Sequence, residues 1–213
     1  MQQVRPLLAA RGFAVPDHPG VRLRTLADVF ADAQAEGVEL RIDGTEVAVG
    51  RPRAHRPGRR AFVSGKRKQN TIKTTTISDA HGRTLWTGAV RPGRMHDQTA
   101  VRTDGIEDLF HQHPTVRAKV DAGYDAGYRG LAKTFPDQIH APPLKPRKAA
   151  SAEQLAAWET ARKRQSSQRI CVEHANAELK QRRPLQRWIG RRESYAEVHL
   201  AVAGLVSDRA AHR

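Results

Sequence analysis

The chain has 213 residues, which is enough for one substantial domain and short for two complete ones. Lys and Arg number 37 against 22 Asp and Glu, and a formal net charge of +15 favours a polyanionic partner such as nucleic acid. No long apolar run and no apolar N-terminal segment occurs, so we expect a cytoplasmic protein without a membrane span. The single cysteine, Cys171, excludes an internal disulfide and a cysteine-rich zinc site.

The N-terminal part is predicted to be a helical segment over residues 1–37, followed by one main domain over residues 38–213. The first 40 residues carry four Arg against five acids, so they are not the expected nucleic-acid-binding part. A helix is predicted over residues 23–35, where apolar side chains recur at helical spacing, with its end at Gly37.

The pattern then changes to the period of a strand. Residues 38–42 alternate and predict a first strand with Asp43 at its end. Residues 51–73 contain nine Lys and Arg and no acid, which indicates a basic loop, most concentrated over 51–68, that leads into a strand. Residues 70–78 and 83–90 predict a hairpin.

Helices and strands are predicted to alternate in the second half of the chain. A helix is expected from His96 and Asp97 onward to residue 109, with Asp97 as its N-terminal cap in preference to a metal ligand. Residues 116–120 and 138–141 predict two strands. A long helix over 151–183 starts with a capping box, a final helix covers 195–211, and the order indicates an α/β fold.

Three acids stand out against the basic background: Asp43 and Asp121, each at the end of a predicted strand, and Glu173 in the long helix. Clustered carboxylates repel one another unless a cation lies between them. Mg²⁺ prefers such hard oxygen ligands, and pairs of Mg²⁺ ions catalyse reactions of phosphodiesters. The three acids therefore predict metal-dependent chemistry on nucleic acid.

The surroundings of Glu173 allow two interpretations. Arg169, Asn176 and Lys180 share its helix face, while Val172, Ala175 and Leu179 form an apolar stripe that we expect to face the core. Glu173 could thus be a metal ligand between cations that bind phosphate. It could equally form an ordinary exposed ion pair with Arg169, and the spacing alone leaves both interpretations open.

Five motifs occur in one order: IDGTE at 42–46, SGKRK at 64–68, RPGRMHD at 91–97, VDAGY at 120–124, and the spacing of Arg169, Glu173 and Lys180. Together they resemble the DDE nuclease domain of bacterial insertion-sequence transposases, of the type also similar to Harbinger-like nucleases. The resemblance runs from Val38 to the C-terminus. It implies a ribonuclease-H-like mixed sheet flanked by helices, Mg²⁺ dependence with Mn²⁺ as a substitute, cleavage and joining of DNA at transposon ends and target, and a homodimer.

By the same resemblance, Asp43, Asp121 and Glu173 would form the catalytic, metal-binding triad, and Arg169 and Lys180 its basic partners. Lys66, Arg67 and Lys68 are the further candidates for DNA binding. The second acid is ambiguous, because the Asp-Ala-Gly-Tyr sequence that starts at Asp121 is repeated from Asp125. Asp121 is favoured because it follows the strand directly, whereas Asp125 better matches the sequence that follows.

Two further departures from the family pattern bear on activity. Ser166 stands where a tyrosine often precedes the helical motif, and residues 1–37 are too short and too acidic for the helix-turn-helix region that such transposases usually carry. This favours a truncated transposase. The alternative hypothesis is a basic DNA-binding remnant without turnover.

Overall fold

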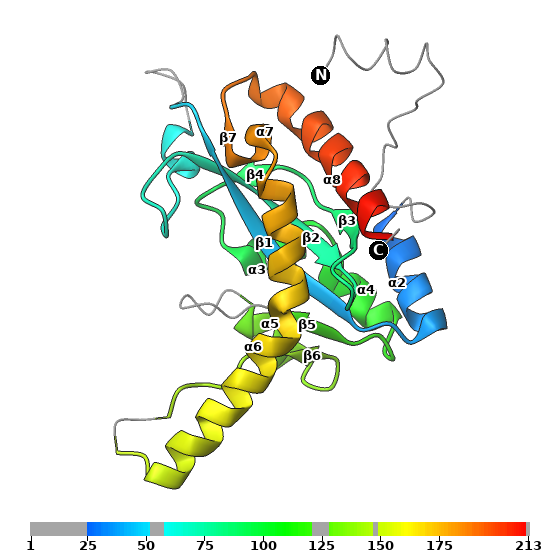
Figure 1. Cartoon of the computed structure of the whole chain (residues 1–213), viewed down its shortest axis with the longest axis vertical. Helices are drawn as coiled ribbons and strands as arrows, with labels where there is room; N and C mark the ends of the chain where they lie inside the picture. The colour runs from blue at the N-terminus through cyan, green and yellow to red at the C-terminus, as the bar shows by residue number, and fades with distance from the viewer. Residues whose placement is uncertain (1–24, 52–57, 121–127, 147–148, 212–213) are drawn as a thin grey trace.

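The computed structural model describes residues 25–51, 58–120, 128–146 and 149–211 (Figure 1). Its elements in chain order are α2 (Leu26–Glu36), β1 (Leu40–Val49), the 3-10 helix η1 (Arg59–Phe62), β2 (Thr71–Ser78), β3 (Thr84–Thr87), β4 (Arg91–Pro92), α3 (Asp97–Thr103), α4 (Ile106–Gln112), β5 (Ala118–Val120), α5 (Arg129–Thr134), β6 (Ile139–His140), α6 (Ala152–Lys180), α7 (Arg183–Gln186), β7 (Arg187–Trp188), η2 (Arg192–Ser194) and α8 (Tyr195–Ala211).

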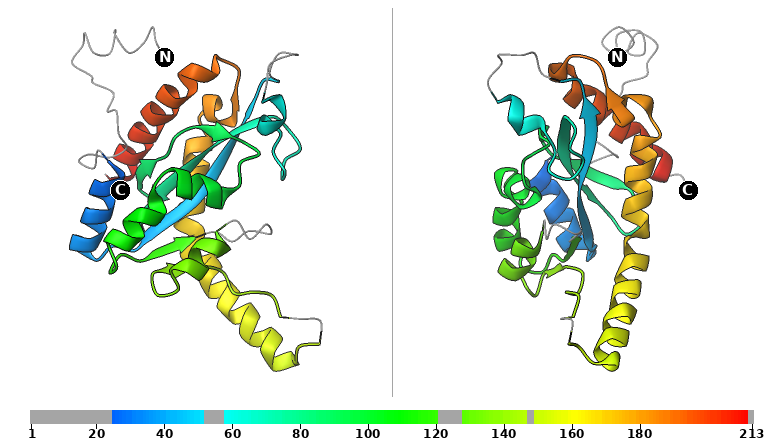
Figure 2. Two further views of the ribbon diagram at one scale, coloured as in Figure 1. Left: turned by 180° about the vertical axis from the view of Figure 1, so that it is seen from behind. Right: turned by 90° about the vertical axis from the view of Figure 1, so that its left-hand side faces the viewer.

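A seven-stranded mixed sheet forms the centre of the molecule, with the main order β3-β2-β1-β5-β6. The first three strands in the chain are antiparallel neighbours, whereas β5 and β6 run parallel to β1. Helices α2 to α5 cover one face of the sheet, and α6, α7 and α8 cover the other (Figure 2). This mixed sheet between helices is consistent with the ribonuclease-H-like fold that the sequence predicted.

Strand β1 is the central strand, and it is longer than predicted. It pairs with β2 from Arg41↔Ser78 to Ala48↔Thr71, so Asp43 lies within the strand and not at its end. The predicted boundary was wrong because the apolar alternation stops near Asp43, while the hydrogen-bonded ladder to β2 continues. A strand boundary depends on such pairing as well as on side-chain pattern.

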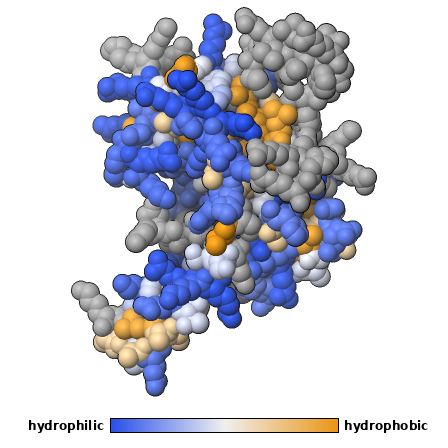
Figure 3. All heavy atoms as spheres, in the orientation of Figure 1, coloured by the Kyte–Doolittle hydropathy of each residue, from blue (hydrophilic) through white to orange (hydrophobic). Residues whose placement is uncertain are grey.

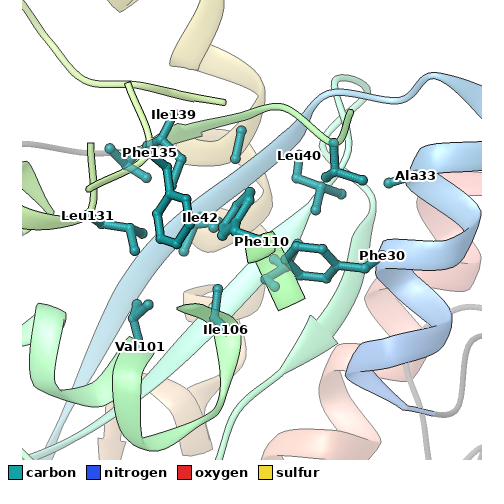
Figure 4. Close-up of a cluster of buried hydrophobic side chains, with 14 of the residues drawn as sticks. Phe30, Ala33, Leu40, Ile42, Val101, Ile106, Phe110, Leu131, Phe135 and Ile139 are labelled. Atoms are coloured by element: carbon teal, nitrogen blue, oxygen red, sulfur yellow. The ribbon is translucent and has the colours of Figure 1, made fainter. Parts of the chain in front are cut away.

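The larger core lies between the sheet and helices α2 to α5 (Figure 4). Leu40 and Ile42 of β1 point into it, and the rings of Phe30 and Phe110 meet edge to face with their centroids 4.9 Å apart. Because successive side chains of a strand alternate between the two faces, Asp43 belongs to the opposite face of β1.

The second core joins the other face of the sheet to α6, α7 and α8. Val47 and Val49 of β1 pack there with Leu179 of α6 and with Tyr195 and Val202 of α8. Asp43 therefore shares its side of the sheet with the helix that carries Glu173.

Most predicted helices are confirmed, with one correction. Thr25 caps α2, and Ser151 and Gln154 form the predicted capping box of α6. The single helix predicted from residue 96 to 109 is wrong: α3 and α4 are separate because Gly105 between them adopts a left-handed conformation with φ 78°. In the described ranges no helix combines the length and the apolar character needed to cross a bilayer.

Helix α6 extends well beyond the sheet. Its outer turns project from the body of the molecule in both Figure 1 and Figure 2. None of the side chains in residues 152–167 is buried, whereas Ala175, Asn176 and Leu179 near the other end are. Only the C-terminal part of α6 thus packs on the sheet.

Candidate active site

Asp43 is half-buried on β1, and two neutral groups donate hydrogen bonds to its carboxylate. The backbone N–H of Gly44 donates to Oδ1 at 2.8 Å, and the side-chain amide Nδ2 of Asn176 donates to Oδ2 at 2.8 Å. Neither donor is charged, so the carboxylate is oriented without having its negative charge neutralised by them. It remains a suitable ligand for a cation.

Helix α6 places Glu173 one turn before the residue that contacts Asp43. Asn176 is only 7% exposed, and Ala175 and Leu179 beside it are buried, as the apolar stripe predicted. Glu173 lies on the same face as Asn176, three residues earlier, and is exposed. Thus α6 carries the second described acid of the predicted triad to the same side of β1 as Asp43.

Oxygen donors from β1 and α6 are of the chemical kind that a hard divalent cation prefers. Two carboxylates, from Asp43 and Glu173, are accompanied by the side-chain oxygen of Asn176, which is buried and has no hydrogen-bond partner in the described part of the chain. Carboxylate and amide oxygens are the ligands that Mg²⁺ and Mn²⁺ accept in proteins. Within the described ranges no three His, Cys, Asp or Glu side chains gather into a metal-binding group.

Lys180 interacts electrostatically both with the carboxylates of β1 and with the basic loop. It is half-buried, and burial lowers the pKa of its amine. The positive charge of Arg67 lowers this pKa further, whereas the negative charges of Asp43 and Glu46 oppose the change. Lys180 therefore lies within electrostatic reach of both the acid on β1 and the loop before β2.

The loop at residues 64–68 presents its cations from a tight turn. The backbone N–H of Lys68 donates to the carbonyl of Ser64 at 3.0 Å, and the N–H of Arg67 donates to the Ser64 hydroxyl at 3.1 Å. Lys66, Arg67 and Lys68 are all exposed on this turn. The turn fixes three neighbouring cations near Lys180, in a position to contact phosphates.

The other predicted site residues fall outside what the structure describes. Asp121 and Asp125 belong to residues 121–127, and the side chain of Arg169 is likewise outside the described part. Val120, the residue before Asp121, pairs with Ile42, the residue before Asp43. The residues directly before the two predicted acids are thus paired on neighbouring parallel strands.

A second polar cluster, which the sequence did not predict, lies on the opposite face of β1. The Lys73 amine is 2.5 Å from Asp97 Oδ1 and 3.6 Å from Glu46 Oε1. Asp97 lies beside Gly44, where an added Cβ would come within 3.2 Å of its Oδ1. The predicted cap was wrong: His96 is the N-cap residue of α3, and the Asp97 side chain turns to Lys73 because that buried cation needs a partner.

The family model described as DDE superfamily endonuclease matches residues 42–206, which is more than half of the chain. The chain belongs to this family. It begins to match in β1, directly before Asp43, and the match ends in α8. Comparison with curated proteins and with solved structures gave no match.

Membership of the DDE superfamily endonucleases identifies the chain as a transposase-like nuclease and implies DNA as its substrate. Nucleases of this superfamily generally use divalent metal ions. The oxygen donors of β1 and α6 agree with that chemistry, and they lie on the side of the sheet where Lys180 and the turn at residues 64–68 supply positive charge. Acids and cations are the kinds of group that hold a metal against a phosphate in metal-dependent nucleases.

Proposed function

We propose that this DDE superfamily endonuclease is a transposase that hydrolyses and joins DNA at the ends of a bacterial insertion sequence. One observation carries the proposal: Asn176 of α6 hydrogen-bonds the carboxylate of Asp43, which sets Glu173 on the adjoining turn of the same helix face. Two of the three predicted acids therefore share one side of the sheet. The proposal assigns the chain to the Harbinger-like subgroup.

The proposed triad consists of Asp43, Asp121 and Glu173, with Asp125 as the alternative second acid. These carboxylates would hold Mg²⁺, for which Mn²⁺ can substitute. When bound, the metal supplies Lewis-acid stabilisation of the attacking and leaving oxygens of the phosphodiester. Asn176 orients the Asp43 carboxylate, and its own unpartnered oxygen faces no competing donor in the described ranges.

The proposed DNA contacts come from Lys66, Arg67, Lys68, Arg169 and Lys180. In this proposal the cations bind backbone phosphates and so position the scissile bond without reading the base sequence. Recognition of the transposon ends would then need a further module, in this chain or in another. Pairing two ends requires two nuclease sites, so the active form is proposed to be a homodimer.

The decisive experiment is Mg²⁺-dependent nicking of supercoiled plasmid by the Asp43→Asn variant. Asparagine keeps the size of the side chain and removes its charge, so nicking should fall to background while binding in a gel-shift assay is retained. Asp108→Asn on α4 is the matched control, because Asp108 is exposed and belongs to a helix on the other face of the sheet. Equal nicking by parent and Asp43→Asn would exclude Asp43 as a ligand.

Asp121→Asn and Asp125→Asn, tested in the same assay, identify the second acid by loss of nicking. The competing hypothesis is a DNA-binding remnant without turnover, which the repeat at Asp121 and Asp125 favours because a four-residue duplication beside a metal ligand can displace it. A parent protein that binds DNA tightly and never nicks it, with Mg²⁺ or Mn²⁺, would support the remnant.

A further inference from the structure

The loop between β7 and η2 exposes an aliphatic side chain to an unusual degree. Ile189 is 90% exposed, more than any other large hydrophobic residue of the described ranges, of which Leu144 follows at 67%. A single exposed hydrophobic residue is common on protein surfaces and needs no explanation by itself. Ile189 differs from such a residue because its backbone is held in place and because many cations surround it.

The backbone on both sides of Ile189 is firmly held. Trp188 pairs with Val49 of β1, and its indole N–H donates to the carbonyl of Arg191 at 2.9 Å, which closes the loop. The Trp188 ring also meets Tyr195 edge to face, with centroids 5.6 Å apart. Gly190 lies so close to this ring that an added Cβ would be 2.6 Å from it. Ile189 thus projects from a loop with little freedom to fold it back.

Two basic segments meet around this loop. Residues 58–68 and 180–192 contain no acid, and together they hold eleven cations: Arg59, Arg60, Lys66, Arg67, Lys68, Lys180, Arg182, Arg183, Arg187, Arg191 and Arg192. The guanidinium of Arg192 lies 4.3 Å from the centre of the Phe62 ring, which joins the two segments in space. Hydrophilic side chains dominate this end of the molecule, where α7 and β7 lie (Figure 3).

An exposed apolar side chain surrounded by cations is chemically suited to duplex DNA. An excess of cations attracts the phosphates of duplex DNA, and an apolar side chain among them cannot hydrogen-bond to phosphate or water. Its favourable environment is between stacked bases, where aliphatic side chains of several DNA-binding proteins act as wedges that unstack a base step. The same end of the molecule includes Lys180, whose pKa is lowered by burial, a change that the negative charge of Asp43 opposes.

We propose that Ile189 inserts between adjacent base pairs of bound duplex DNA and unstacks that step at the β7 end of the sheet, while the surrounding arginines hold the phosphates. The inference rests on the proposed function, because it takes DNA as the substrate. It adds a distortion of the duplex at a distance of about 20 Å along β1 from Asp43, because Trp188 pairs with Val49 at the far end of this strand.

The test uses the full chain and short duplexes in which 2-aminopurine replaces adenine at successive TA steps, with Ca²⁺ in place of Mg²⁺. Unstacking raises the fluorescence of this base, so the parent should give a severalfold increase at one labelled step. Ile189→Ser should abolish the increase while DNA affinity stays within about twofold, since the phosphate contacts remain. Ile189→Met should restore it, because methionine also supplies an apolar wedge.

Leu144→Ala is the matched control, an exposed aliphatic residue outside the two basic segments, and it should leave the fluorescence unchanged. A fluorescence increase with Ile189→Ser equal to that of the parent would overturn the wedge. So would a change of oligomeric state in this variant by analytical ultracentrifugation, which would make Ile189 a contact between copies. A parent that binds DNA without any increase refutes the wedge alone, whereas absence of DNA binding refutes the proposed function as well.

Discussion

Asn176 is a neutral residue that orients the charged carboxylate of Asp43 through a hydrogen bond. Its amide N–H group fixes Oδ2 of Asp43, whereas a lysine there would neutralise the carboxylate and compete with a cation. The sequence placed Asn176 on the same helix face as Glu173, because helical periodicity determines which residues share a face. It could not show that this face meets Asp43, because 133 residues separate the two partners and only the packing of α6 on the sheet joins them.

His199 makes stability depend on pH. It is buried in α8, its Nδ1 lies 3.3 Å from the Tyr195 hydroxyl, and burial lowers its pKa from 6.5 to about 4. The unfolded chain therefore takes up a proton at higher pH than the folded chain. The histidine's contribution to stability is fully present above pH 6.5 and is lost as the pH falls from 6.5 to about 4.

We expect the free energy of unfolding of the parent to fall by about 2 kcal/mol more between pH 7 and pH 5 than that of His199→Gln. Glutamine does not titrate in this range, so the variant loses this part of the pH dependence even if its stability at pH 7 is lower. Urea unfolding followed by circular dichroism at both pH values measures the difference. Exposed His111→Gln is the control, and an equal pH response of parent and His199→Gln would contradict the assignment.

At the scale of elements, an ion pair attaches α3 to the sheet. Lys73 of β2 is only 8% exposed and lies between Asp97, the first residue of α3, and Glu46 of β1. Replacing Lys73 by methionine leaves two acids without their cation and should cost roughly 3 kcal/mol of stability. Asp97→Asn should cost about 1 kcal/mol, because Glu46 still faces the lysine.

Chemical denaturation of the two variants measures this difference, with Arg102→Met as the control. Arg102 pairs with Glu107 at 2.9 Å, and its side chain is 65% exposed, so water screens its charge far more than that of Lys73. Its loss should cost clearly less than the loss of Lys73. A Lys73→Met variant as stable as the parent would show that the cluster does not hold α3 in place.

The elements were predicted best where local signals are strong. The capping box of α6, the apolar spacing of α2 and the hairpin of β2 and β3 all follow from neighbouring residues, and all three elements are confirmed. The two-residue strands β4 and β7 were not predicted, because nothing in so short a sequence distinguishes a strand from a loop. Each exists through pairing with a longer strand: β4 with the preceding β2, and β7 with β1, which lies far away in the chain.

At the scale of the whole molecule, charge is distributed unevenly. Residues 58–68 and 180–192 combine eleven cations without an acid at one end of the sheet, although more than a hundred residues separate them in the chain. The net charge of +15 predicted a polyanionic partner from composition alone. Composition could not say where the cations gather, because that depends on the pairing of β7 with β1.

Replacing residues 66–68 by glutamine should weaken DNA binding and flatten its dependence on salt. Each phosphate contact contributes about 0.9 to the slope of log K against log salt concentration, so the slope should fall by about 2 to 3. The control replaces the three exposed cations at residues 162–164, on the outer turns of α6. Fluorescence anisotropy at several salt concentrations measures both, and equal slopes for the two triple variants would contradict a DNA-binding role of the turn.

The projecting half of α6 has a mechanical consequence. The helix contains neither glycine nor proline over its 29 residues, so it forms one stiff rod of about 43 Å. Glu173 lies near the end of α6 that packs on the sheet, whereas the outer turns of the helix project away from it. We expect a load applied at the tip to be transmitted along the axis to the turn that carries Glu173, whereas Asp43 is anchored in the sheet.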